Sequence, residues 1–253
     1  MGARTDEVAG WLGDARAVTV LTGAGISTES GIPDFRGPQG LWTRNPEAQR
    51  MFTLQSYVAD PEVRKRSWRN RRDHAAWTAE PNAGHRALVD LERSGRLNVI
   101  VTQNIDGLHQ KAGSDPDHVV EIHGTIWLAE CLSCRRRVAM AEVLARVDAG
   151  EADPPCEECG GLLKSATISF GQALDRDVLA AATQAAAGCD VFLAVGTSLT
   201  VFPAASLPEL AMAAGARLVV VNAEPTPYDD AAAAVLREPI GQVLPRLVAQ
   251  LVG

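Results

Sequence analysis

The chain has 253 residues, a net charge of −7, and 46% hydrophobic and 22% charged residues. These proportions are typical of a globular protein, and the acidic balance excludes a general electrostatic attraction of the whole molecule to nucleic acid or anionic lipid. No apolar run approaches the roughly 20 residues that span a bilayer, and residues 1–10 are too polar for a signal peptide. We therefore expect a soluble, cytoplasmic monomer without a membrane or nucleic-acid partner.

Short apolar stretches rich in β-branched residues predict the strands of a buried sheet. They lie at 18–21, 97–101, 191–195 and 218–221. Such continuous apolar runs are typical of strands covered on both faces, as in a parallel sheet. Stretches rich in alanine and leucine predict helices at 177–187, 207–214 and 241–252. The alternation favours a Rossmann-like, doubly wound α/β fold.

Two segments interrupt this alternation, and we expect them to form a smaller, inserted lobe. One is 37–80, which is polar and aromatic and expected to be helical, and the other is 125–164, which holds four of the five cysteines. The chain would then be a single domain, 1–253, whose Rossmann-like lobe comprises 1–36, 81–124 and 165–253. A cleft between the two lobes would offer a ligand site.

A glycine-rich turn follows the first predicted strand, where Gly23, Ala24 and Gly25 lead to Ser27. The backbone amides of such a turn can receive a pyrophosphate. The third glycine of the dinucleotide fingerprint is missing, because Thr28 stands at that spacing. A plain tight turn is therefore an equally good interpretation of these residues alone.

The sequence Gly-Ile-Pro-Asp-Phe-Arg at 31–36 places an acid, an aromatic and a base side by side, which core packing does not require. Together with Gly-Ala-Gly-Ile-Ser at 23–27, it resembles the sirtuins, NAD⁺-consuming protein lysine deacylases. The resemblance implies that this loop closes over NAD⁺. Asp34 and Arg36 would contact the cofactor, and Phe35 would shield the reacting carbon.

A dense polar group follows the second predicted strand, with Gln103, Asn104 and Asp106 around Ile105. Strand ends in this fold face the ligand crevice, and these side chains suit ribose hydroxyls and a carboxamide. Capping of the next helix by Asn104 and Asp106 is the alternative. The sirtuin resemblance extends to this Thr-Gln-Asn-Ile-Asp segment and implies that it holds the nicotinamide ribose and amide, with Asn104 and Asp106 taking part in catalysis.

His123 follows a short apolar stretch and directly precedes the cysteine-containing segment. A lone histidine is more often structural, but an imidazole with an ordinary pKa near 6.5 suits a base that works near neutral pH. The resemblance implies that His123 is the catalytic base, and we expect His109 to be structural.

Four cysteines form two Cys-x-x-Cys pairs, which 21 residues separate, and Cys189 is left over. This spacing predicts a structural zinc site, with Cys131, Cys134, Cys156 and Cys159 as ligands. Four thiolates leave no open coordination position, so the metal would organise the lobe rather than activate water. A pair of redox dithiols is the alternative.

The stretch 166–172 stands where sirtuins bind the acyl-lysine peptide as an added strand, and the resemblance implies that Ile168 and Phe170 line the acyl-lysine channel. The family's usual Arg-Pro is replaced by Lys164 and Ser165, and its acid by Gln172. The family's desuccinylases carry Tyr-x-x-Arg in the helical segment. Here Trp68 and Arg71 are the nearest match, which favours deacetylation and leaves desuccinylation through Arg71 open.

Three further segments complete the resemblance. They imply cofactor contacts from Gly196, Thr197 and Ser198 after the third strand, from Asn222 and Glu224 after the fourth, and from Ile240. The predicted function is NAD⁺-dependent deacetylation of acyl-lysine proteins, which releases nicotinamide and O-acetyl-ADP-ribose. The alternatives are a desuccinylase or demalonylase, a protein mono-ADP-ribosyltransferase, a non-catalytic NAD-sensing module and an NAD dehydrogenase with structural zinc.

Overall fold

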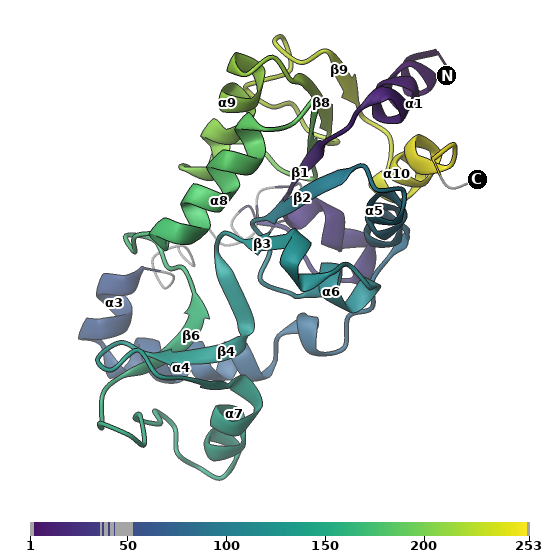
Figure 1. The fold of residues 1–253 in the computed structure, drawn as a ribbon. Coiled ribbons are helices and arrows are strands. Elements are labelled where there is room, and N and C mark those ends of the chain that lie inside the picture. Colours follow the sequence, from purple (N-terminus) through teal and green to yellow (C-terminus); the bar gives the residue numbers. More distant parts are fainter. Residues whose placement is uncertain (1–2, 36, 38–39, 41–42, 44–52, 252–253) are drawn as a thin grey trace.

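The computed structural model describes residues 3–35, 37, 40, 43 and 53–251 (Figure 1). They form a six-stranded sheet with the order β3-β2-β1-β7-β8-β9 and a three-stranded sheet with the order β5-β4-β6. In the described part of the chain, no helix is both long and apolar enough to cross a membrane.

The large sheet is parallel throughout. Its strands are β1 Val18–Thr22, β2 Leu97–Thr102, β3 Val119–Glu121, β7 Val191–Val195, β8 Arg217–Val221 and β9 Ala234–Leu236. The four strands that the apolar runs predict are all present, and β1 and β7 are buried along their whole length. The strand order reverses at β1 and β7, which pair side by side, and this switch point is where doubly wound sheets bind ligands.

Helices cover both faces of this sheet, because the side chains of each strand alternate between two hydrophobic clusters. Val18 and Val20 of β1 belong to one cluster, and Leu21 belongs to the other. The first cluster includes α1 Ala3–Asp14, α5 Ala83–Arg93 and α10 Ile240–Val248. The second includes α8 Arg176–Ala187 and α9 Leu207–Ala213. The Rossmann-like, doubly wound prediction is thereby confirmed.

The small sheet is antiparallel and consists of β4 Gly124–Cys131, β5 Arg137–Ala139 and β6 Leu163–Thr167. It lies below the large sheet in Figure 1, together with α3 Leu54–Ala59, α4 Pro61–Arg72 and α7 Met140–Asp148. Trp68 of α4 packs with Met140 and Val143 of α7 in its core. The division into two lobes stays a prediction, and β6 spans the predicted boundary at 164–165.

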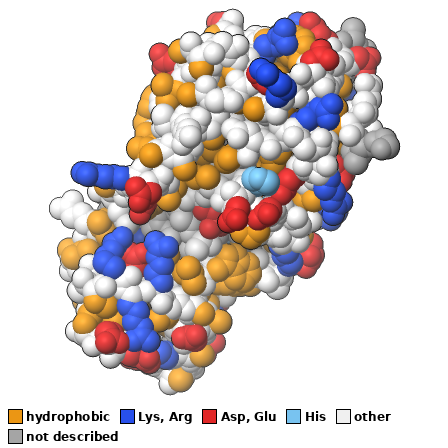
Figure 2. All heavy atoms as spheres, viewed as in Figure 1, with side chains coloured by type: hydrophobic (Ala, Val, Ile, Leu, Met, Phe, Trp, Pro, Cys, Tyr) orange, Lys and Arg blue, Asp and Glu red, His pale blue; other side chains and the backbone are white. Residues whose placement is uncertain are grey.

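The basic residues of α4 differ in their exposure. Arg66, Arg69 and Arg72 are exposed, as a solvated helix face would be, but Arg64 is only 8% exposed. Several Lys and Arg side chains lie over the part of the surface that carries α3, α4 and the small sheet (Figure 2).

Short helical segments are the remaining named elements of the residues that the structure describes. They are α6 Leu108–Ala112 and the 3-10 turns η1 Ala24–Ser30, η3 Ala75–Trp77, η4 Pro116–His118 and η5 Ala204–Ser206.

Candidate active site

The loops after β1 and β7 approach each other so closely that glycine is required where they meet. The amide of Gly25 donates to the carbonyl of Gly196 at 2.8 Å. A Cβ atom on Gly25 would lie 2.7 Å from Gly196 Cα, and one on Gly23 would lie 2.7 Å from the Gly196 carbonyl oxygen. Gly196 also has a φ of +61°, which favours glycine. The predicted cofactor segments at 23–27 and 196–198 therefore lie in contact at the switch point.

Polar side chains from the loop after β2 join these two loops. The Gln103 side-chain amide donates to Thr197 Oγ1 at 2.9 Å. The Asn104 amide donates to the Gly23 carbonyl at 3.1 Å and to Ser27 Oγ at 3.2 Å. Asn104 and Ser27 are 8% and 1% exposed, so these bonds are shielded from water. The structure thus brings predicted cofactor residues from three loops into one network.

Asp106 extends this network and is 4% exposed. Its Oδ2 accepts a hydrogen bond from Ser27 Oγ at 2.7 Å, and its Oδ1 accepts from the amide of Leu108, the first residue of α6, at 3.0 Å. The second contact satisfies the first amide of α6 from the position before its N-cap residue, Gly107, whereas Asn104 bonds Gly23 and Ser27 instead of this helix. Burial raises the pKa of Asp106 above its ordinary value, and the two hydrogen bonds act against that shift.

His123 follows β3 and lies at the junction of the two sheets. Its Nδ1 lies 3.1 Å from the Gln103 carbonyl oxygen, which only accepts, so Nδ1 carries the proton in the neutral ring and Nε2 holds the free lone pair. Its carbonyl accepts from the amide of Ile168 at 2.8 Å. Burial lowers the pKa of His123, while the Gln103 contact acts in the opposite direction. The neutral imidazole is therefore the form present near pH 7.

A buried pair of histidines, His85 and His109, packs beside the end of β1. The sequence predicts a structural role for His109 but does not identify the pair. His109 is 1% exposed, and its Nε2 lies 3.0 Å from Thr22 Oγ1, at the end of β1. The His109 ring lies 5.1 Å from that of His85. Asn82 forms a capping box with His85 at the start of α5 and donates to the Ile26 carbonyl of η1 at 2.7 Å. A polar residue directly before the amphipathic stretch at 83–93 is the signal that indicates this cap.

The other predicted cofactor residues are more scattered. Ser198 Oγ bonds Thr200, and the side chain of Asn222 donates to the Glu224 carbonyl at 2.8 Å. Ile240 packs against the core cluster of the large sheet, beside Gly84. Asp34 Oδ1 accepts from the amide of Gly37 at 3.0 Å, and Arg36 lies outside the described residues. Of the remaining predicted residues, Ala24 begins η1, Phe35 directly follows Asp34, and Ile105 lies between Asn104 and Asp106.

The segment after β6 provides an exposed edge near His123. Ile168 follows Thr167 directly, and Phe170 is 37% exposed. The Phe170 carbonyl accepts from the amide of Leu54 at 3.0 Å, and Phe170 forms a parallel bridge with Thr53. The predicted peptide edge is therefore held on one side by the N-terminus of α3.

Trp68 and Arg71 lie one turn apart on α4, but their side chains have different surroundings. Trp68 is 1% exposed and packs in the core of the small sheet. Arg71 Nη2 donates to Thr167 Oγ1 at 3.2 Å, next to the predicted acyl channel. Within the described ranges, no carboxylate forms an ion pair with Arg71. Burial lowers the pKa of Arg71 to about 10, at which the guanidinium is still charged at neutral pH.

Lys164, which stands in place of the usual arginine, is 4% exposed, and its ammonium donates to the carbonyls of Ser165 and Thr167. Burial and the neighbouring Arg71 lower the pKa of Lys164 to about 8. Its head group is therefore directed at the backbone of β6 and does not reach solvent.

The two cysteine pairs come together at one end of the small sheet. All four are free thiols, and their sulfur atoms lie within 4.8 Å of one another. The Cys131 and Cys159 sulfurs are 3.5 Å apart, and those of Cys134 and Cys156 are 3.7 Å apart. Tetrahedral zinc with Zn–S bonds of about 2.3 Å requires sulfurs roughly 3.8 Å apart. The cluster thus fits one structural zinc ion.

Comparisons with known proteins agree with this arrangement. Residues 23–203 match the model of the Sir2 family. The chain is 58% identical to NAD-dependent protein deacetylase 2 of Streptomyces coelicolor. The alignment spans 231 residues and covers 91% of this chain and 96% of the relative. It is 45% identical to NAD-dependent protein deacetylase 1 of Bradyrhizobium diazoefficiens, over 92% of this chain and 91% of the relative.

Solved structures lead to the same family. A structure described as "Sir2-p53 peptide-NAD+" superposes with a TM-score of 0.87 at 32% identity and covers 98% of both chains. Another, described as "Sir2 bound to acetylated peptide", has a TM-score of 0.86 at 31% identity and the same coverage. The chain therefore belongs to the Sir2 family.

Proposed function

We propose that this protein is an NAD-dependent protein deacetylase, which transfers the acetyl group of an acetyl-lysine side chain to ADP-ribose and releases nicotinamide. The observation that carries the proposal is the network of Ser27, Gln103, Asn104 and Asp106 at the β1/β7 switch point, beside the free Nε2 of His123. Its relatives bear the names of NAD-dependent protein deacetylases, which supports the same conclusion.

The residues at the switch point fit a dinucleotide. The loops at 23–27 and 196–198 carry no bulky side chain where they meet, so a pyrophosphate can approach their backbone closely. Gln103 and Asn104 hold the nicotinamide ribose, and Asp106 faces the carboxamide. When bound, NAD⁺ supplies an activated ribose carbon from which nicotinamide can depart.

His123 is the general base of the reaction. The Gln103 carbonyl fixes the proton on Nδ1, so Nε2 is free to accept a proton from a ribose hydroxyl. Burial keeps the ring neutral near pH 7. The acyl-lysine peptide lies as an added strand along 168–170, with Ile168 and Phe170 beside the lysine chain.

Cys131, Cys134, Cys156 and Cys159 hold the zinc ion, which stabilises the small sheet. Unbonded thiols that bind zinc require a reducing compartment, and this favours a cytoplasmic location. Cell fractionation tests the location, and light scattering of the purified protein tests the predicted monomer.

The proposal is tested by mass spectrometry of an acetyl-lysine peptide incubated with the protein, with and without NAD⁺. Loss of the acetyl group only in the presence of NAD⁺, together with O-acetyl-ADP-ribose, is the expected result. Label from NAD⁺ that stays attached to protein would instead indicate ADP-ribosyl transfer. If the protein binds NAD⁺ but changes neither the peptide nor NAD⁺, the alternative of a non-catalytic NAD-sensing module would be favoured.

Desuccinylation is a second candidate, because the guanidinium of Arg71 lies beside Thr167 without a carboxylate partner among the described residues. A succinyl carboxylate would supply that partner. In parallel assays, Arg71→Met should then reduce activity on a succinyl-lysine peptide while it leaves activity on the acetyl-lysine peptide unchanged. Equal effects on both peptides would show that Arg71 does not recognise the succinyl carboxylate.

A further inference from the structure

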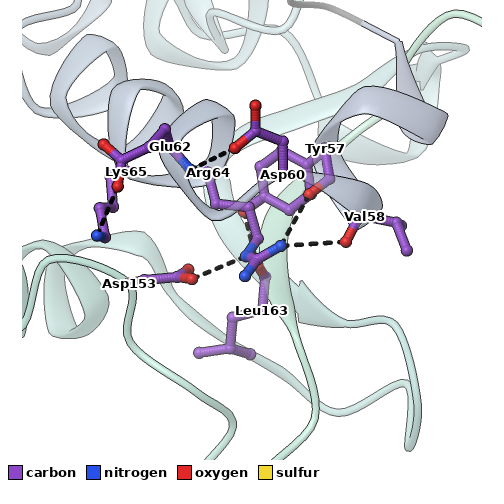
Figure 3. A network of polar contacts seen from close by, with 8 residues as sticks. All are labelled: Tyr57, Val58, Asp60, Glu62, Arg64, Lys65, Asp153 and Leu163. Atoms are coloured by element: carbon purple, nitrogen blue, oxygen red, sulfur yellow. Dashed lines mark hydrogen bonds and ion pairs between the residues drawn. The ribbon is translucent and has the colours of Figure 1, made fainter.

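Arg64 is buried, whereas Arg66, Arg69 and Arg72 of the same helix are exposed. Its Nε lies 2.8 Å from Asp153 Oδ2, and the two side chains are 10% and 22% exposed. Its Nη1 donates to the carbonyls of Tyr57 and Val58 at 3.2 and 3.1 Å (Figure 3). One guanidinium therefore joins α4, α3 and the loop that leads to the second cysteine pair.

These contacts tie the C-terminal end of α3 to the small sheet. Tyr57 and Val58 lie in the last turn of α3, where backbone carbonyls lack partners within the helix. Asp153 lies three residues before Cys156. The Tyr57 hydroxyl also donates to the Leu163 carbonyl of β6 at 2.7 Å. Two independent interactions thus hold this end of α3.

The N-terminal end of α3 holds the peptide edge. The Leu54 amide donates to the Phe170 carbonyl at 3.0 Å, and Thr53 forms a bridge with Phe170 while capping the helix through Ser56. A helix of six residues is about 9 Å long, so fewer than two turns of hydrogen-bonded backbone join its two ends. A displacement at its C-terminal end is therefore passed to Phe170.

We propose that Arg64 and Asp153 are positioning residues, which set the peptide-binding edge at Phe170 through α3. The proposal rests on the proposed function. An added strand bonds to backbone groups, so the edge must be in place before the peptide binds. The hydrogen bonds of Arg64 join it to Asp153 and to α3, away from the loops after β1, β2 and β7. Peptide recognition should therefore depend on the pair more than NAD⁺ recognition does.

The test compares Arg64→Met, Asp153→Asn and the double variant by steady-state kinetics with an acetyl-lysine peptide and NAD⁺. We expect the KM for the peptide to rise roughly three- to tenfold, as coupled contacts suggest. The KM for NAD⁺ and kcat should stay near the wild-type values. The double variant should be no worse than Arg64→Met, because each single change leaves one charge without its partner.

Glu62→Gln is the matched control, since the exposed Glu62 lies on the same helix and, among the described residues, forms its ion pair with Lys65. Its peptide KM should not change. If Arg64→Met does not fold, Tyr57→Phe removes the Leu163 contact alone and should raise the peptide KM in the same direction.

An unchanged peptide KM in a folded Arg64→Met variant, or an equal change in the KM values for both substrates, would overturn the inference. If Arg64→Met does not fold, an unchanged peptide KM in Tyr57→Phe would overturn the inference as well. An inactive wild-type protein would instead reject the proposed function, so the two failures are distinguishable.

Discussion

The carboxyl edge of the large sheet and the region around the small sheet both bury polar groups, but these groups have different partners. At the edge, Asn104 and Asp106 bond side chains from other loops, and His123 keeps one ring nitrogen free. Beside the small sheet, Arg64 of α4 donates to Asp153 and to backbone carbonyls of α3, and the four cysteine sulfurs lie close together. Polar groups in the first region suit ligand binding, and those in the second stabilise the fold. Substitutions in the first region should therefore mainly reduce activity, and those in the second should mainly reduce stability.

His123→Ala should have the largest effect on activity and the smallest on stability. Removing a general base costs roughly 10²- to 10⁴-fold in kcat. The half-buried ring makes one hydrogen bond to the Gln103 carbonyl, so the melting temperature and NAD⁺ binding should stay near wild type. Assays of deacetylation, calorimetric NAD⁺ titration and thermal melting check this. Undiminished turnover would remove His123 from the mechanism.

Cys156→Ser should act in the opposite way, on structure first. Loss of one thiolate weakens zinc binding, and zinc-binding energy is folding energy for the part that it holds. We expect metal content below one ion per chain and a lower melting temperature. Cys189→Ser is the control, because Cys189 lies in the large-sheet core, away from the cluster. If both variants kept their zinc, the four-cysteine site would be wrong.

Gly25→Ala should damage both stability and cofactor binding, because its methyl group would meet Gly196 Cα at 2.7 Å. Overpacking of this kind costs about 1 to 3 kcal/mol. The KM for NAD⁺ should rise as the two loops separate. Gly10→Ala in α1 provides the contrast, since nothing lies within 4 Å of its added methyl group. That change should stabilise the helix by roughly 0.5 to 1 kcal/mol. Similar melting temperatures for the two variants would contradict the close approach.

A further prediction is a pH dependence of stability from the buried histidine pair. Burial lowers the pKa of His109 to about 3 and that of His85 to about 4, below the ordinary value near 6.5. The unfolded chain therefore binds more protons below pH 6.5, and the free energy of unfolding falls as the pH drops from about 6.5 toward 4. Urea unfolding at a series of pH values measures this slope. His109→Gln should flatten it, and an unchanged slope would show that other groups cause it.

Much of the large-sheet region follows from local sequence. Runs of mainly apolar, β-branched residues predict β1, β2, β7 and β8, because a strand that is covered on both faces carries few polar side chains. The Cys-x-x-Cys spacing predicts the metal site for a similar reason, since a short turn brings each pair of sulfurs within reach of one ion. The loop motifs indicate which residues gather at the carboxyl edge, although their individual roles stay predictions.

The sequence by itself thus determined the fold class, the family and the cysteine cluster, because each depends on residues close together in the chain. Only the tertiary structure decided the surroundings of Arg64 and Trp68, which lie on one helix but make different contacts. Arg64 and Asp153 are 89 positions apart, and Gln103 and Thr197 are 94 apart. No local pattern encodes such pairs, because the partner of a buried polar group is whichever side chain the packing of the two sheets brings within hydrogen-bonding distance.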